Sequence, residues 1–142
     1  MLLRRSLRAE PGDVLLNSTG TGTIGRCCLF EEEGVFLVDS HVTLVRVKKD
    51  LLDPRWLNLI LMSRWGQNYL ESRCFTGSTS QVELSRADLG RMPIPVPSIK
   101  EQRRIVEVID AIGSQERAIE MELDKLRTLK QGVVNDLLRG RV

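Results

Sequence analysis

Residues 97–142 read PSIKEQRRIVEVIDAIGSQERAIEMELDKLRTLKQGVVNDLLRGRV, and this stretch decides the fold. One set of positions in it recurs at alternating steps of four and three, which places the set on one narrow stripe of a helix, as in the seam of a coiled coil. The seam comprises Ile105, Ile109, Ile112, Glu116, Ile119, Leu123, Leu126, Lys130, Val133 and Leu137. Eight of these ten side chains are apolar. A lone helix with such a bare stripe is not stable in water, so a second helix is expected to cover it.

Both ends of this helix are marked in the sequence. Ser98 can cap the first turn, and Glu101 three residues later can complete a capping box. Gly140 is a suitable stop. At about 1.5 Å per residue, a helix over residues 99–139 is roughly 60 Å long.

The seam also favours one orientation of the partner helix. Glu116 and Lys130 occupy the same heptad position, so in a parallel homodimer each would face its own copy. In an antiparallel pair, Glu116 approaches Lys130 of the second copy and Leu123 lies near the crossing point. We therefore predict an antiparallel homodimer. Two alternatives stay open: a second helix from a different chain, and a long helix packed on its own globular domain.

Composition gives few further constraints on function. The expected division is a domain over residues 1–97 and the long helix over 98–142. The first part carries 12 Lys/Arg and 11 Asp/Glu, and the second carries nine and eight. Charge alone therefore gives no sign of nucleic-acid binding, and any basic patch must arise by folding.

The three cysteines show no metal-ligand spacing. We interpret Cys27, Cys28 and Cys74 as reduced thiols in a cytoplasmic protein. No leader peptide is evident, and no apolar run approaches the roughly 18 residues of a membrane span. No metal or cofactor is expected.

Strands alternate with turns through the first part of the chain, at residues 14–16, 26–30, 35–38 and 42–47. Asp53 followed by Pro54 predicts the start of a helix that runs to about Leu70 and is weakened by Gly66. A polar loop is expected at 76–81, a short helical turn at 85–89 and an extended proline-rich segment at 92–97. The predicted fold class is α+β: a small mixed or antiparallel β-rich domain with one sizeable helix, followed by a long C-terminal coiled-coil helix.

Gly20, Gly22 and Gly25 match the pattern G-x-G-x-x-G. A dinucleotide fingerprint needs a helix that opens at the last glycine, whereas residues 26–30 predict a strand. The glycines more simply permit a tight loop that exposes Ser and Thr hydroxyls, and such a loop can lie against a phosphate backbone. His41 is the only histidine, and a structural role is its simplest interpretation. No nucleophile–base pair or other catalytic constellation is recognisable, so the chain is not expected to be an enzyme.

Residues 76–81, TGSTSQ, form a second candidate surface. Hydroxyls and a glutamine amide can donate to phosphates and contact base edges. An ordinary solvated loop explains the same composition equally well.

Three segments together resemble the specificity subunit of type I restriction–modification enzymes. They are GDVLLNSTGTGTIGR (12–26), VDSHVTLVRV (38–47) and TGSTSQVELSRADLGRMPIPVPSIKEQRRI (76–105). The most specific part of the resemblance is the junction at residues 93–105, where PIPVP is followed by Glu101, Gln102 and Ile105. The resemblance extends over nearly the whole chain, but the recognition domain is shorter than the family's, so we expect it to lack the N-terminal part of such a domain.

The resemblance implies a fold and a role. Target recognition domains each read half of a split DNA sequence, and two long helices pair antiparallel as a ruler between them. Methyltransferase (modification) and endonuclease (restriction) subunits dock around this scaffold, which performs no chemistry itself. Such a chain is either a truncated fragment or a half-subunit that dimerises.

On this basis we predict a double-stranded DNA-recognition fragment with a dimerising helix. The candidate DNA contacts are Ser18, Thr19, Thr21, Thr23, Arg26, His41, Arg73, Thr76, Ser78, Thr79 and Gln81. One alternative is a protein–protein assembly module that uses the same helix without contacting DNA. Another, a nucleotide-binding enzyme, rests on the glycine loop alone.

Overall fold

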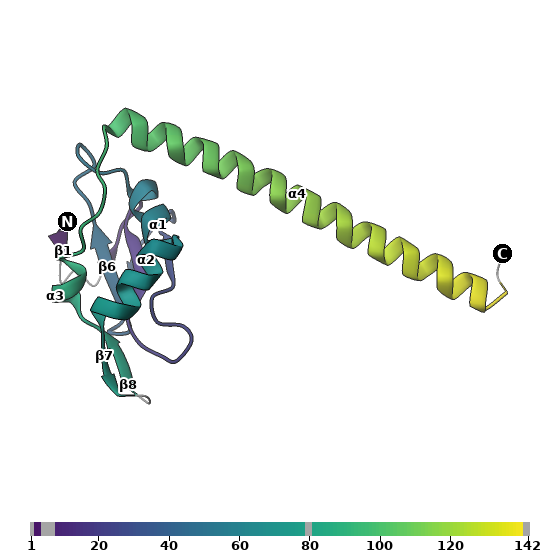
Figure 1. Cartoon of the computed structure of the whole chain (residues 1–142), viewed down its shortest axis with the longest axis horizontal. Helices are drawn as coiled ribbons and strands as arrows, with labels where there is room; N and C mark the ends of the chain where they lie inside the picture. The colour runs from purple at the N-terminus through teal and green to yellow at the C-terminus, as the bar shows by residue number, and fades with distance from the viewer. Residues whose placement is uncertain (1, 4–7, 79–80, 141–142) are drawn as a thin grey trace. The chain divides into compact units, whose positions relative to one another are not determined.

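A four-stranded antiparallel sheet forms the centre of the first part of the chain, with the strand order β1-β6-β3-β4 (Figure 1). The structure is a computed structural model that describes residues 2–3, 8–78 and 81–140. The strands of this sheet are β1 (Leu2–Leu3), β3 (Val14–Asn17), β4 (Cys27–Leu29) and β6 (Val42–Arg46). A separate two-stranded ladder joins β2 (Arg8–Ala9) to β5 (Phe36–Leu37). Together with the helices described below, these sheets confirm the α+β class and the long C-terminal helix.

The central pair, β3 and β6, carries the register of the sheet. Leu16 lies opposite Thr43, and Val14 lies opposite Val45. Val14, Leu16 and Val45 are completely buried, because the β-branched and leucine side chains on this face pack against helices rather than water. This packing fixes the register, since a slip of one residue would turn the apolar side chains to the other face.

One buried ion pair lies at the start of β3. The Asp13 carboxylate is 1% exposed and accepts two bonds from Arg46, Nε at 2.7 Å and Nη2 at 2.6 Å. The bond to Asp13 raises the pKa of the Arg46 guanidinium above its already high value. Such a bidentate pair satisfies a charge that would otherwise be costly to bury.

The predicted helix over residues 54–70 is in fact two helices. α1 (Pro54–Met62) ends at Ser63, which has an extended backbone and whose side chain caps α2 (Arg64–Tyr69) by accepting from the Gly66 N–H; a π-helical turn, η1 (Leu70–Cys74), follows. Gly66 lies where the two helices approach each other: a Cβ there would lie 2.1 Å from the Ile60 carbonyl oxygen. Its role is therefore close packing of α2 against the end of α1. As predicted, the Asp53 side chain caps α1, with Pro54 in its first turn.

The segment predicted as a polar loop at 76–81 is instead an antiparallel hairpin. β7 (Phe75–Ser78) pairs with β8 (Gln81–Leu84), and the prediction of a loop was wrong for its described residues. The short helix α3 (Arg86–Leu89) follows and is capped by Ser85, close to the predicted helical turn. Figure 1 shows the hairpin at the end of this part of the chain remote from the first turns of the long helix.

The long helix α4 (Ile99–Leu138) begins after the extended proline-rich segment, as predicted. Ser98 Oγ accepts a bond from the Glu101 N–H at 3.3 Å, and Gly140 follows the helix with φ +63°. Contacts divide the chain into Met1–Val106 (unit 1) and Glu107–Val142 (unit 2). The first two turns of α4 thus belong to unit 1, where Gln102 and Val106 are buried.

In unit 2 the seam side chains are uncovered on the single chain. Ile109, Ile112 and Ile119 are 42%, 54% and 66% exposed. Leu123, Leu126, Val133 and Leu137 are also exposed. A coiled coil stays a prediction, because nothing in the single chain shows what covers this stripe. Within the described ranges, no helix is both long and apolar enough to cross a bilayer.

Candidate functional site

The glycine loop connects β3 to β4 through residues 18–26. Gly20, Gly22 and Gly25 have φ values of +94°, +78° and +85°, which side-chain-bearing residues rarely adopt. Strand β4 follows the last glycine, whereas a dinucleotide fingerprint requires a helix there. The loop instead packs on its neighbours: Gln67 Nε2 donates to the Gly25 carbonyl at 3.1 Å, and a Cβ on Gly25 would lie 2.9 Å from Phe75.

One hydroxyl predicted to be exposed in this loop is buried. Ser18 is 5% exposed, and its Oγ lies 2.5 Å from Thr43 Oγ1. Sequence reasoning failed here because Ser18 follows directly on a core strand and its partner lies 25 residues away. Ser18 is therefore not part of the exposed surface of the loop.

Thr19 and His41 lie together at the surface. Thr19 Oγ1 is 2.9 Å from His41 Nδ1, and Asp39 Oδ1 accepts a bond from the His41 N–H. The backbone joins the same two segments, because the Ser18 N–H donates to the His41 carbonyl at 2.7 Å. The structure thus brings the glycine loop and His41 to one place, although they are 22 residues apart in sequence.

The register of the β7–β8 hairpin separates a polar face from an apolar one. Thr76 pairs with Glu83 and Ser78 with Gln81, whereas Phe75 pairs with Leu84 and Gly77 with Val82. Paired residues in an antiparallel ladder project to the same side, and successive residues alternate. One face of the hairpin therefore consists of Thr76, Ser78, Gln81 and Glu83, all of them exposed.

A β-bridge extends this polar face into the glycine loop. Thr19 pairs with Glu83, and the Leu84 N–H donates to the Ser18 carbonyl at 2.9 Å. Thr19 is therefore a neighbour of Glu83 on the same side, and His41 adjoins Thr19. We call this surface the polar face; its members are Thr19, His41, Thr76, Ser78, Gln81 and Glu83.

The other predicted contact residues stand apart from this surface in different ways. Thr21 and Thr23 are exposed in the glycine loop, and the Thr23 hydroxyl donates back to the loop carbonyls of Thr19 and Gly20. Arg26 and Arg73 are exposed, but no described contact joins them to the polar face. Thr79 lies outside the described residues.

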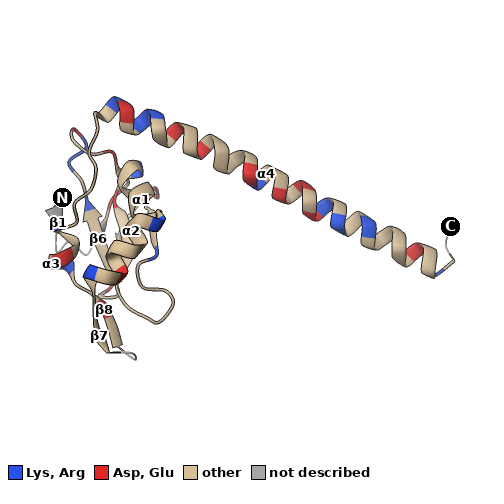
Figure 2. Ribbon diagram, in the orientation of Figure 1, with Lys and Arg blue, Asp and Glu red and all other residues tan. Residues whose placement is uncertain are grey.

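Sequence reasoning missed two charged residues here. Glu83 belongs to the polar face by the hairpin register, and Arg86 donates from Nε to Thr43 Oγ1 at 3.3 Å. Alternation in TGSTSQVEL could have indicated the hairpin and hence Glu83. No local pattern predicts the contact of Arg86 with a strand 43 residues earlier. Figure 2 shows that the β7–β8 hairpin carries little charge, whereas acidic and basic residues are distributed along α4.

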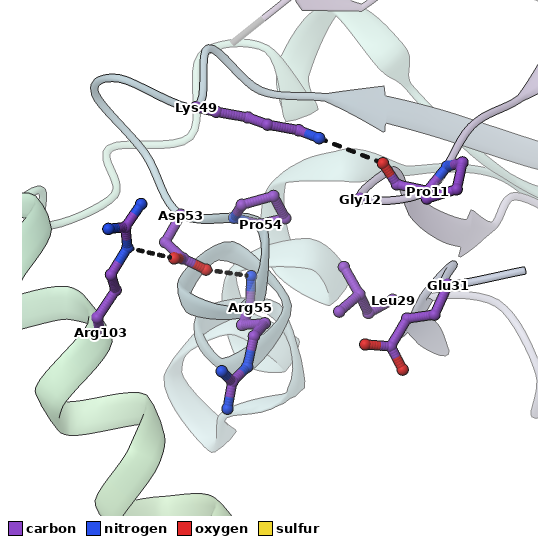
Figure 3. A pocket seen from close by; sticks show the side chains of 9 residues that line it. All are labelled: Pro11, Gly12, Leu29, Glu31, Lys49, Asp53, Pro54, Arg55 and Arg103. Carbon is purple, nitrogen blue, oxygen red and sulfur yellow. Dashed lines mark hydrogen bonds and ion pairs between the residues drawn. The ribbon is translucent and has the colours of Figure 1, made fainter.

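A cavity of about 420 Å³ lies beside the start of α1, and Figure 3 shows the side chains that line it. Three of its charged groups have partners within the protein: Arg103 bonds Asp53 at 3.3 Å, and Lys49 donates to the Pro11 carbonyl at 3.3 Å. Gly12 precedes β3, whereas the glycine loop follows it, so the cavity and the polar face lie toward opposite ends of that strand. Nothing in the cavity pairs a nucleophile with a base.

Two of the three cysteine thiols, those of Cys27 and Cys74, are poorly suited to act as nucleophiles. Burial, helped by the neighbouring Cys28, raises the pKa of Cys27 to about 11, and burial also raises the pKa of Cys74. Both thiols are therefore protonated near neutral pH, and the thiol form is a weak nucleophile. In the part of the chain that the structure describes, no group of three His, Cys, Asp or Glu residues could hold a metal ion.

Comparison with known proteins shows what the sequence is similar to. Residues 7–128 match the family model described as the type I restriction modification DNA specificity domain. The chain is 30% identical over 102 residues to a protein of Haemophilus influenzae named as a candidate type I restriction enzyme specificity subunit. It is 23% identical over 128 residues to a Methanocaldococcus jannaschii protein named as a candidate MjaX specificity subunit.

The two relatives are much longer than the matched region. The first alignment covers 71% of this chain and 24% of the relative, and the second covers 89% and 30%. The chain thus spans about a quarter to a third of the length of the curated relatives it matches.

Proposed function

This chain belongs to the family of type I restriction modification DNA specificity domains, and from that premise we propose that it recognises duplex DNA through the polar face. In this proposal residues 1–97 supply the recognition and residues 98–142 supply a spacer and assembly helix. The chain performs no catalysis itself.

The observation that carries the proposal is the convergence of three segments on one exposed polar surface. The glycine loop, the β6 entry at His41 and the β7–β8 hairpin are joined by the Thr19–Glu83 bridge and the Thr19–His41 bond. A two-stranded ribbon has the dimensions to enter the major groove, where hydrogen-bonding groups distinguish base pairs.

The side chains of the polar face suit this chemistry. Gln81 can bond adenine in a bidentate manner, hydroxyls such as Ser78 can contact several bases, and a carboxylate such as Glu83 can accept from the cytosine amino group. The hairpin backbone holds them in a fixed relative order, because Gly77 (φ +112°) allows the strands to approach: a Cβ there would lie 2.0 Å from the Gln81 carbonyl oxygen. Specific reading needs such preorganised donors and acceptors.

The spacer role rests on the exposed stripe of α4. Pairing of Glu116 with Lys130 of a second copy favours an antiparallel homodimer through the predicted seam. Exposed Val108, Met121 and Leu129 lie outside that seam, so other helices can pack beside the pair. We propose that methyltransferase and endonuclease subunits assemble there and are thereby positioned on DNA.

The test is binding of the full chain to a labelled duplex of random sequence, followed over a salt series. DNA contact predicts that the binding constant falls steeply as salt rises, because each neutralised phosphate releases counterions. The alternative, a protein–protein module that uses the same helix, predicts no duplex binding but retained association with methyltransferase subunits.

A matched pair of variants assigns the binding to the polar face. Thr76→Ala with Gln81→Ala removes two of its side chains, and Thr128→Ala with Gln131→Ala makes the same change on exposed positions of α4. We expect the first variant to weaken binding to a preferred duplex by about tenfold or more, and the second to leave it unchanged. Equal affinities for both variants would remove the polar face from the account.

A further inference from the structure

We propose that Arg86 is a phosphate-contacting residue at the border of the polar face, and that Thr43 positions it. This inference rests on the proposed function, since it names the residue that supplies positive charge to the DNA interface. Arg86 is not predicted by any motif, and its place follows only from the fold.

The need for such a residue follows from the composition of the hairpin. The described residues 75–78 and 81–84 include one charged side chain, Glu83, and it is negative. A ribbon that enters a groove lies between two phosphate backbones, and a surface without cations gains little from them. Positive charge must therefore come from residues outside the ribbon but next to it.

Arg86 lies three residues after Glu83, at the start of α3. Its Nε donates to Thr43 Oγ1 at 3.3 Å, and Thr43 follows His41 by two residues on β6. Both ends of this contact are thus attached to segments that form the polar face. On this adjacency in the fold we place the guanidinium beside the polar face, where a phosphate would flank the bound groove.

The anchor of Arg86 is itself fixed. Thr43 is 2% exposed, and its hydroxyl is 2.5 Å from the hydroxyl of buried Ser18. A hydroxyl has one donor and two acceptor sites, so Thr43 can satisfy Ser18 and still accept from Arg86. Ser18 therefore helps to hold the Thr43 hydroxyl in the position from which it accepts the bond from Arg86.

The chemistry of the anchor leaves the charge of Arg86 available. A neutral hydroxyl restrains the guanidinium without cancelling its charge, whereas Arg46 and Arg91 are paired with carboxylates at 2.6 Å and 2.9 Å. The Ser85 hydroxyl and then Arg91 keep the pKa of Asp88 below its usual value, so that carboxylate stays ionised beside Arg91. Among the described residues, the two terminal nitrogens of Arg86 have no protein acceptor, and their fork suits a phosphate.

The test compares variants of the full chain in duplex binding from about 50 to 200 mM salt. Arg86→Met should lower affinity about tenfold and reduce the slope of log K against log salt by about 0.9, the value for one phosphate. It should do so equally for random and preferred sequences. Arg64→Met removes the same charge from exposed α2 and should leave affinity and slope near the wild type.

Two further variants separate charge from position. Arg86→Lys keeps the charge but lacks the planar fork, so it should retain the salt slope and lose part of the affinity. Thr43→Val removes the hydroxyl that anchors Arg86 and leaves Arg86 itself unchanged. It should likewise retain the salt slope and lose part of the affinity. Thermal unfolding of each variant reports folding, and Arg86→Lys keeps the inference testable if Arg86→Met is unstable.

Three outcomes would overturn the inference. An unchanged salt slope in Arg86→Met would show that no phosphate is contacted. A change in preferred sequence, with the slope retained, would make Arg86 a base-reading residue instead. If the wild-type chain binds no duplex, the proposed function itself fails. This outcome is distinct from the other two, because it is observed with the wild-type chain before any variant is measured.

Discussion

Gln102→Met tests how the first turns of α4 are held in unit 1. Gln102 is completely buried, and its amide satisfies three backbone groups from two segments. Oε1 accepts from the Asp53 N–H at 2.9 Å, while Nε2 donates to the carbonyls of Leu51 at 3.1 Å and Pro97 at 2.8 Å. One side chain thus connects the start of α1, the end of the proline-rich segment and α4.

The expected loss follows from these three bonds. Methionine is unbranched, is close to glutamine in length and is a good helix former, so the substitution removes hydrogen bonds with little change of shape. A buried intramolecular bond contributes about 1 kcal/mol, and an orphaned buried partner costs about 1–3 kcal/mol. We expect a loss of about 3 kcal/mol, a large share of the roughly 5–15 kcal/mol that stabilises a domain.

Urea unfolding followed by tryptophan fluorescence measures this loss directly. Trp56 is 7% exposed, and its Nε1 donates to the Pro95 carbonyl at 2.9 Å, so its emission reports on the same junction. Gln115→Met is the matched control, because Gln115 is exposed on the same helix and should change stability by less than about 0.5 kcal/mol. A Gln102→Met loss as small as that of the control would refute the assigned role.

Three further predictions concern α2 and the seam. Gly66→Ala should destabilise unit 1 by about 3 kcal/mol, because its Cβ would lie 2.1 Å from a backbone oxygen that cannot move easily; chemical denaturation measures the loss. Leu123→Glu with Leu126→Glu should convert the dimer to monomer, since both place charge in the middle of the seam, and light scattering gives the mass. Glu116→Lys should weaken the dimer and added Lys130→Glu should restore it, as sedimentation over a concentration series would show.

Each of these predictions has its own check. Gly132→Ala, where a Cβ would meet nothing within 4 Å, should favour the helix by about 1 kcal/mol, so a loss similar to that of Gly66→Ala would discredit the packing argument. An unchanged mass for the double leucine variant would count against the seam. Failure of the second charge reversal to rescue the first would remove the antiparallel register but leave a coiled coil possible.

The long helix could be predicted well from the sequence because its signals are local. Ser98, the heptad spacing and Gly140 each act within a few residues, and α4 ends within one residue of the predicted boundary. The same holds for the Asp53 cap and the strand at 42–47, which is rich in β-branched residues and contains no proline. Local chemistry determines these elements, and tertiary contacts only add to it.

Other elements depend on contacts distant in sequence and were missed. After the break at Ser63, α2 approaches the end of α1 closely at Gly66, and helical periodicity cannot show that contact. The prediction of a loop at 76–81 is wrong because glycine and small polar residues are also typical of turns; the strand pairing found instead is supported by the bridge to Thr19. Here tertiary structure overrides local preference.

The candidate site divides in the same way. Exposed hydroxyls and Gln81 could be proposed from composition, because small polar residues near glycines suit a binding loop. Burial of Ser18, the alignment of Glu83 with Thr19 and the anchoring of Arg86 by Thr43 all require the sheet register. Most segments of the polar face could therefore be predicted from the sequence, but not that their side chains project to the same side of the sheet.

Selection of bound duplexes from a random pool tests the central claim most directly, since a recognition module must prefer some sequences. We predict that the full chain enriches a defined sequence, and that Thr76→Ala with Gln81→Ala loses or alters this preference while Thr128→Ala with Gln131→Ala keeps it. Recovery of an unenriched pool by the wild-type chain, at salt where duplex is bound, would contradict the account.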